Sequence, residues 1–206
     1  MHRNSVRFHL DEDGWASGVV RTPSPNFDAR GEGVPVSLLV IHNISLPPDE
    51  FGGPYIADLF LNRLDFDAHP YFDQLRSLRV SAHFLIRRDG EVVQFVSTKD
   101  RAWHAGVSNF FGRERCNDFS IGVELEGTDF VPFEDAQYVS LAALTAALTA
   151  AYSLQAVAGH EHIAPGRKTD PGPFFEWSRY ESDYRRLLVQ DQKSGIAHAD
   201  LRFHPV

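Results

Sequence analysis

Residues 36–43 have the sequence VSLLVIHN, a continuous apolar run that ends in two polar residues, His42 and Asn43. An apolar run without alternation is typical of a strand that is buried on both faces at the centre of a sheet. The pattern therefore predicts a central strand, and it places His42 at the end of that rigid element.

Two further strand regions lie downstream. The segment RVSAHFLIRRDGEVVQFVS, residues 79–97, reads as a hairpin with its turn at 88–91, where Asp-Gly supplies the positive φ of a tight turn. In SIGVELEG, residues 120–127, apolar residues alternate with glycine and glutamate. This alternation predicts a half-buried strand whose carboxylates, Glu124 and Glu126, point away from its apolar side.

Helical patterns separate and follow these strands. Pro54 and Pro70 each open a short helical pattern. Apolar residues at helical spacing predict a long helix over 134–152, although the preceding VPFED lacks a Ser, Thr or Asp cap, and a last helix around Tyr180 and Tyr184. Residues 1–35 and the tail from 190 read as irregular or loosely held. The class is α/β with a mixed sheet, because the hairpin is antiparallel.

Composition limits the kind of partner. The chain has 206 residues, enough for one domain, and its formal charge of −8 argues against nucleic acid. Cys116 is its only cysteine, so an internal disulfide is excluded and a reducing compartment is favoured. The sequence shows no signal-peptide pattern and no apolar run of about 20 residues. We therefore expect a cytoplasmic protein without membrane partner, acting as a monomer.

A cluster of titratable residues lies in GHEHIAPGRKTDPGP, residues 159–173, a run that looks too broken for helix or strand. His42, His160 and Asp170 together match a catalytic zinc site, in which three protein ligands leave a fourth position for water. The compact His-x-Asp pair usual in iron oxygenases is absent. The alternative is that these histidines cap a strand or fill the core.

Further groups could complete the chemistry. Lys168 lies two positions before Asp170 and could stabilise an oxyanion, or it could be a solvated loop lysine. Glu124 and Glu126 share one strand face, and either could be the general base for a metal-bound water. The residues alone do not choose between the two glutamates.

Five separated stretches carry a family resemblance. The sequences VIHNISLPP, SAHFLIRRDG, AWHAGVS, GRERCNDFSIGVELEGTD and GHEHIAPGRKTDPGP resemble, in order and wording, the AmpD family of N-acetylmuramoyl-L-alanine amidases. The resemblance runs from about Gly14 to Trp177, so we expect a zinc amidase domain over 14–188, a lead-in over 1–13 and a tail over 189–206. It implies the fold of peptidoglycan recognition proteins, a central mixed sheet flanked by helices.

The resemblance also implies an activity. It is the hydrolysis of the bond between 1,6-anhydro-N-acetylmuramic acid and L-alanine of the stem peptide, in cytoplasmic peptidoglycan recycling. It implies one zinc ion per chain on His42, His160 and Asp170, with Glu124 as the catalytic carboxylate and Lys168 in the oxyanion role. Glu161 and His162 are then not ligands, and His83 and His104 are near neighbours of the site.

Four residues are candidates for binding the anhydro-muropeptide substrate. Arg79 and Arg115 could bind the carboxylates of the stem peptide, Trp103 could form an apolar wall for the sugar, and Asn43 could donate a hydrogen bond. The alternatives are a surface ion pair, a core indole and a strand-end cap. A different class of function is also open, a non-catalytic muropeptide sensor on the same fold, as is an amidase that acts on whole cell wall.

Overall fold

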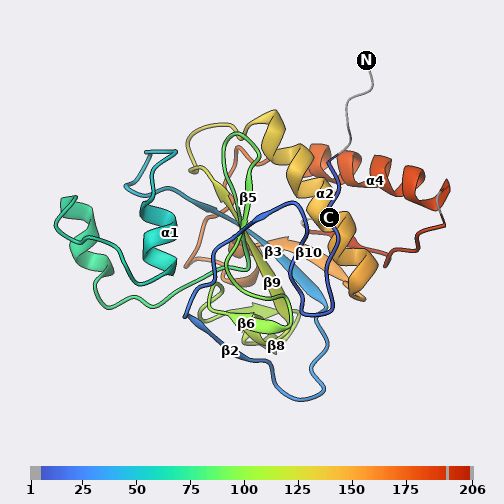
Figure 1. The fold of residues 1–206 in the computed structure, drawn as a ribbon, viewed down its shortest axis with the longest axis horizontal. Helices are drawn as coiled ribbons and strands as arrows, with labels where there is room; N and C mark the ends of the chain where they lie inside the picture. The colour runs from blue at the N-terminus through green and yellow to red at the C-terminus, as the bar shows by residue number, and fades with distance from the viewer. Residues whose placement is uncertain (1–5, 194, 205–206) are drawn as a thin grey trace.

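The computed structural model describes residues 6–193 and 195–204, and its centre is a seven-stranded mixed sheet (Figure 1). The strand order is β1-β5-β4-β9-β3-β10-β11. These strands are β1 (Val20–Arg21), β3 (Leu38–Ile44), β4 (Phe84–Ile86), β5 (Val92–Gln94), β9 (Ser120–Glu126), β10 (Ala156–Gly159) and β11 (Arg202–Phe203). Within this sheet the β4–β5 hairpin is antiparallel and the other described pairs are parallel. The predicted mixed α/β class is confirmed.

The central position predicted for residues 36–43 is also confirmed. Strand β3 lies between β9 and β10 and is parallel to both. Its apolar residues alternate between two cores: Leu39 and Ile41 join the cluster that contains α2 and α4, and Leu38 and Val40 join a cluster on the opposite face. His42 follows Val40 on that opposite face, since residues two apart in a strand point the same way.

Helices cover both faces of the sheet. Helices α2 (Asp135–Ala151) and α4 (Trp177–Lys193) pack together on one face, and α1 (Tyr55–Phe60) lies on the other side of the molecule (Figure 1). The 3-10 helix η1 (Pro70–Leu75) packs with α1 in a second apolar cluster against β4 and β5. The smaller elements are β2 (Phe27–Ala29) with β6 (Asp100–Ala102), β7 (Asn109–Phe110) with β8 (Arg113–Glu114), η2 (Cys116–Asp118) and α3 (His160–Ile163). No helix in the described part of the chain combines the length and apolar character needed to cross a bilayer.

The prediction that β9 is half-buried was wrong. All seven of its residues are buried, including Glu124 at 9% and Glu126 at 1% exposure. Sequence alternation reports which side chains are apolar, but it does not report what covers the polar face. Here distant loops cover that face, and the two carboxylates lie inside the protein.

The entry of α2 uses a glutamine in place of a Ser, Thr or Asp cap. Gln137 Oε1 accepts a hydrogen bond from the Glu134 backbone N–H at 3.0 Å, which is the backward half of a capping box. Its Nε2 donates to the carbonyls of Ile86 and Glu126 at 3.2 and 3.0 Å. One buried amide thus joins the helix start to β4 and β9.

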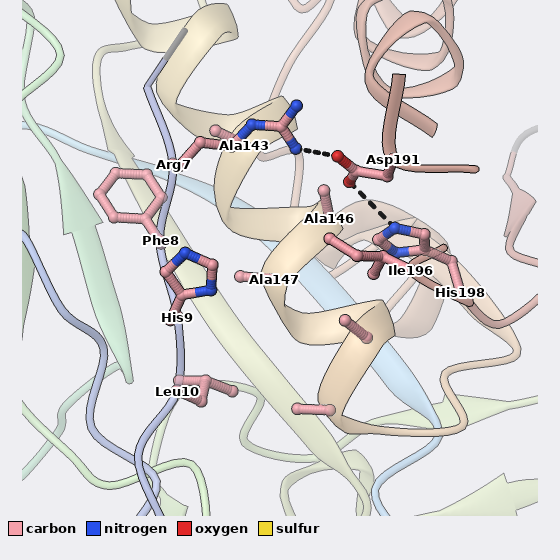
Figure 2. Close-up of a pocket in the computed structure, with 12 residues that line it drawn as sticks. Arg7, Phe8, His9, Leu10, Ala143, Ala146, Ala147, Asp191, Ile196 and His198 are labelled. Atoms are coloured by element: carbon pink, nitrogen blue, oxygen red, sulfur yellow. Dashed lines mark hydrogen bonds and ion pairs between the residues drawn. The ribbon is translucent and has the colours of Figure 1, made fainter. Parts of the chain in front are cut away.

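The two ends of the chain are more ordered than the sequence predicts. Residues 6–35, which were predicted to be irregular, contain β1 and β2, and the described part of the tail contributes β11, which extends the sheet beside β10. Arg7 forms an ion pair with Asp191, which also lies 3.0 Å from His198 Nε2 (Figure 2). The expectation of a loosely held tail was therefore wrong for residues 202–203, which pair with β10. The domain limits at 14 and 188 stay a prediction.

Candidate active site

The three predicted ligands meet at the carboxyl ends of neighbouring strands. His42 lies on β3, and His160 is the first residue of α3, directly after β10. The 159–173 segment is thus less broken than predicted, because it begins with one helical turn. His42 Nδ1 lies 3.0 Å from both His160 Nδ1 and Asp170 Oδ2, and His160 Nδ1 lies 3.1 Å from Asp170 Oδ2.

This triangle fits a metal ion. Ligand atoms at the usual zinc distances of about 2.0–2.2 Å from a tetrahedral centre lie roughly 3.3 Å apart, close to the spacing found here. His160 Nε2 lies 3.0 Å from the Ala105 carbonyl, to which it can donate, so its Nδ1 lone pair is left to face the other two atoms. His42, His160 and Asp170 can therefore hold a metal ion.

The electrostatics keep these groups in the form that binds a cation. Burial lowers the pKa of His42 to about 4, although its hydrogen bond to Asp170 opposes the shift. Burial alone would raise the pKa of Asp170, but hydrogen bonds with His160 and His42 outweigh it and hold that pKa below the ordinary value. Near neutral pH, His42 is neutral and Asp170 is a carboxylate, as metal ligands must be.

Glu124 lies beside this triangle. In the β3–β9 register it is the partner of His42. Its Oε2 is buried without a hydrogen-bond partner among the described residues, and a buried polar atom of this kind is costly unless something binds to it. Burial, and then the charge of Asp170, raise the pKa of Glu124 well above its usual value, while Lys168 opposes the shift. Its carboxylate is placed to exchange a proton with a bound molecule.

Glu126 occupies a different environment. Its Oε1 accepts a hydrogen bond from the Gly52 N–H at 2.7 Å and lies 3.4 Å from Arg87 Nη1, and its Oε2 accepts from the Arg88 N–H at 3.2 Å. This carboxylate ties a loop and the hairpin to β9. Of the two glutamates, Glu124 lines the cavity at the triangle and Glu126 does not.

A cavity of about 370 Å³ opens over the triangle, with Lys168, Trp103 and Asn43 among its lining residues. Lys168 is exposed at its rim and Trp103 is half-buried in its wall. The Asn43 amide donates to Asp129 Oδ1 at 2.7 Å and to the Pro171 carbonyl at 3.1 Å. One amide hydrogen therefore supports the segment after β9 and the other supports the loop that carries Asp170, and the amide oxygen is the atom left for a ligand.

The two predicted arginines lie outside this cavity. Arg79 is exposed, and its Nη1 donates to the Leu78 carbonyl at 2.7 Å. Arg115 has a side chain that is 74% exposed and lies 3.2 Å from Asp118. It lines a separate depression beside Arg167. The structure does not bring either arginine to the metal triangle.

The other histidines differ in how close they lie to the triangle. His162 accepts a hydrogen bond from the Gly159 N–H at 2.8 Å and is not part of the triangle, as predicted. His83 is fully buried, and its Nδ1 accepts from the Gly122 N–H at 3.0 Å. His104 lines the cavity, and its Nδ1 lies 2.9 Å from His42 Nε2.

Two positions near the site were missed from the sequence. Arg167 Nη2 donates to the Ala105 carbonyl at 2.7 Å, the same carbonyl that His160 contacts. Ser120 Oγ lies 3.2 Å from His104 Nε2. No local pattern marks either residue, and only the position of Arg167 next to Lys168 could have drawn attention to it. Cys116 is buried, as predicted, and burial raises the pKa of its thiol.

Known proteins resemble this chain over most of its length. The profile of the family Amidase_2, N-acetylmuramoyl-L-alanine amidase, matches residues 32–173. The chain is 59% identical, over 84% of its length and 94% of the relative, to the 1,6-anhydro-N-acetylmuramyl-L-alanine amidase AmpD of Salmonella typhimurium.

Solved structures of related amidases share this fold. The crystal structure of a selenomethionine AmpD derivative is 57% identical with a TM-score of 0.81, covering 84% of this chain and 98% of that one. The E. coli amidase AmiD, solved with anhydro-N-acetylmuramic acid-L-Ala-D-γ-Glu-L-Lys, is 29% identical with a TM-score of 0.54, covering 84% of this chain and 65% of that one. Drosophila peptidoglycan recognition protein SA shares the fold alone, at 18% identity and a TM-score of 0.50, covering 73% of this chain and 80% of that one. The predicted fold is confirmed, and the chain belongs to the AmpD family of N-acetylmuramoyl-L-alanine amidases.

Proposed function

We propose that this amidase is zinc-dependent and hydrolyses the amide bond between 1,6-anhydro-N-acetylmuramic acid and L-alanine of the stem peptide. The observation that carries the proposal is the convergence of His42 Nδ1, His160 Nδ1 and Asp170 Oδ2 beside the unpartnered carboxylate oxygen of Glu124. The AmpD relative at 59% identity bears the name of this activity. A sensor that only binds muropeptides would not need a buried carboxylate beside a metal site.

The roles of the residues follow from their chemistry. A zinc ion on His42, His160 and Asp170 would supply Lewis-acid chemistry, polarising the amide carbonyl and lowering the pKa of a water to about 7. Glu124 takes the proton of the attacking water and passes it to the leaving amine of alanine. Such proton transfer typically contributes about 10²–10⁴ in rate. Lys168, at the cavity rim, places an ammonium near the oxygen on which negative charge develops.

Substrate binding extends beyond the reacting bond. We assign Trp103 to the sugar and the Asn43 oxygen to a hydrogen-bond donor of the substrate, because both residues line the cavity. Arg79 and Arg115 are assigned to the carboxylates of the stem peptide. Both arginines are exposed outside the cavity. Their guanidinium groups could bind the carboxylates of a stem peptide that extends out of it.

We place the activity in cytoplasmic peptidoglycan recycling, by a monomer with one zinc ion per chain. A small anhydro-muropeptide is the substrate expected there. The cysteine is buried and unpaired, which suits a reducing compartment.

The test combines metal analysis with product release. The purified protein should contain one equivalent of zinc by mass spectrometry and release L-alanyl peptide from a synthetic anhydro-muropeptide. Prolonged chelation should abolish release, and stoichiometric zinc should restore it. Undiminished release by the metal-free protein would overturn the mechanism, binding without release would support the sensor, and faster release from intact sacculi would overturn the substrate assignment.

A further inference from the structure

His104 lies directly behind one of the metal ligands. The imidazole rings of His42 and His104 meet edge to face, with centroids 5.0 Å apart and an interplanar angle of 86°. On the side of His42 away from the triangle, its Nε2 lies 2.9 Å from His104 Nδ1. On the far side of His104, its Nε2 lies 3.2 Å from Ser120 Oγ. The three side chains form a line that ends at the metal site.

The protons along this line can be arranged in two ways. If His42 Nε2 carries the proton and donates to His104 Nδ1, the Nδ1 lone pair of His42 is free to face the metal site. If His104 Nδ1 carries the proton and donates to His42 Nε2, neutral His42 must hold its own proton on Nδ1, where it blocks the ligand position. The first arrangement puts the His104 proton on Nε2, where Ser120 Oγ can accept it. The Ser120 hydroxyl would donate to Nε2 in the second arrangement, but in the arrangement that metal binding requires it accepts from the buried His104 Nε2–H, which would otherwise lose this partner.

The surroundings hold His104 in this orientation. A Cβ at position 122 would lie 2.5 Å from His104 Cγ, so the glycine on β9 makes the space in which the ring lies. The Asn117 side chain accepts the His104 backbone N–H at 3.1 Å. Ser120 is fully buried, and its carbonyl accepts a hydrogen bond from Arg30 Nη2 at 2.8 Å. These contacts hold the backbone of both residues in place.

We propose that His104 is a positioning residue that sets the tautomer of His42, with Ser120 as its partner, and thereby sets the metal affinity of the site. This inference rests on the metal site of the proposed function. A neutral imidazole in this place orients the ligand and adds no charge, whereas a carboxylate would add a negative charge. The positive charge of a bound ion would therefore be neutralised less than in a site where a carboxylate contacts the ligand.

The test uses two replacements of similar size. In His104→Asn the amide oxygen can take the place of Nδ1 as acceptor, whereas His104→Leu fills the space without a lone pair. Zinc dissociation constants of the metal-free proteins are measured by competition with a chromophoric chelator, and the absorption spectrum of the cobalt-loaded proteins reports the ligand set. His104→Leu should weaken zinc binding by about 10–100-fold, the usual effect of losing such a partner. His104→Asn should stay within a few-fold of wild type.

Ser120→Ala supplies an independent readout, also if His104→Leu fails to fold. It should weaken zinc binding several-fold in the wild-type background and have no effect in the His104→Asn background, whose amide has no tautomer to set. Equal losses in His104→Asn and His104→Leu, or wild-type affinity in Ser120→Ala, would overturn the inference. If wild-type protein bound no zinc, the proposed function would fail instead, so the two failures are distinguishable.

Discussion

At the scale of single residues, Glu124 and Glu126 show how position decides chemistry. They are two residues apart on one strand, and both are buried. Glu126 is satisfied by the Gly52 and Arg88 N–H groups and by Arg87, so it acts as a structural anchor. Glu124 keeps one oxygen without a partner and lies at the metal triangle. An unsatisfied buried carboxylate is expensive, which is why we assign it to catalysis.

Glu124→Gln and Asp170→Asn should therefore fail differently. Glu124→Gln removes the base but no ligand, so zinc content should stay at one equivalent while kcat falls by about 10²–10⁴. Asp170→Asn removes an anionic ligand, so both zinc and activity should be lost. Zinc analysis and initial rates on an anhydro-muropeptide check this, and a near-normal rate for Glu124→Gln would move the base role elsewhere.

At the scale of elements, the β4–β5 hairpin depends on its turn glycine for two reasons. Gly90 has a φ of +86°, a conformation that residues with a Cβ rarely adopt. A Cβ there would also lie 2.9 Å from the Ala136 carbonyl on the first turn of α2. The turn is thus shaped both by its own conformation and by the helix that packs on it.

Gly90→Ala and Gly112→Ala separate the two effects. Gly112 has the same φ of +86° but nothing within 4 Å of its added Cβ. Gly112→Ala should lower the free energy of unfolding by about 1 kcal/mol through backbone strain. Gly90→Ala should lower it by about 1–3 kcal/mol more, because the new methyl group meets α2. Urea denaturation measures the free energy of unfolding of both variants. Equal losses would show that α2 moves aside without a loss of stability.

At the scale of the whole molecule, a row of buried histidines couples stability to pH. His83 is packed between β6 and β9, where it meets the Arg30 guanidinium, the Asp100 carbonyl and the His104 ring. Burial, and then the charge of Arg30, lower its pKa to about 3. Folded His83 therefore stays neutral at pH values where the unfolded chain takes up a proton.

The metal-free protein should thus lose stability as the pH falls below about 6.5, the ordinary histidine value, towards 3. In that window the unfolded state binds more protons, so each such histidine costs about 1.4 kcal/mol per pH unit. His83→Asn keeps an acceptor for the Gly122 N–H but cannot titrate. Urea denaturation between pH 5 and 7.5 should show a smaller dependence of stability on pH for this variant, by a difference that approaches one proton at the lower end, and identical slopes would contradict the assignment.

Much of the site was predictable from the chain alone. The unbroken apolar run of residues 36–43 predicts a central strand, and His42 at its end is where it was expected. The motif around His160 and Asp170, read through the family resemblance, indicates the triangle that the structure assembles. These features are local sequence patterns or recognisable family motifs, so they can be predicted without knowledge of tertiary contacts.

Other features depended on segments that are far apart along the chain. Periodicity identified the apolar face of β9 but not the loops that bury its carboxylates. The tail looks polar and unstructured by itself, yet residues 202–203 become β11 because β10 offers a free edge. The partnership of His104 with His42 joins residues 62 apart.

The sequence thus predicted the central strands β3 and β9, the β4–β5 hairpin and the long helices, because spacing and chemical type are properties of a segment. The family resemblance added the three residues of the triangle. Which glutamate is left without a partner, how His42 is oriented and where the arginines lie were settled only by the folded chain. The physical reason is that burial and hydrogen bonding belong to pairs of groups, and the partner of each of these groups comes from a distant part of the protein.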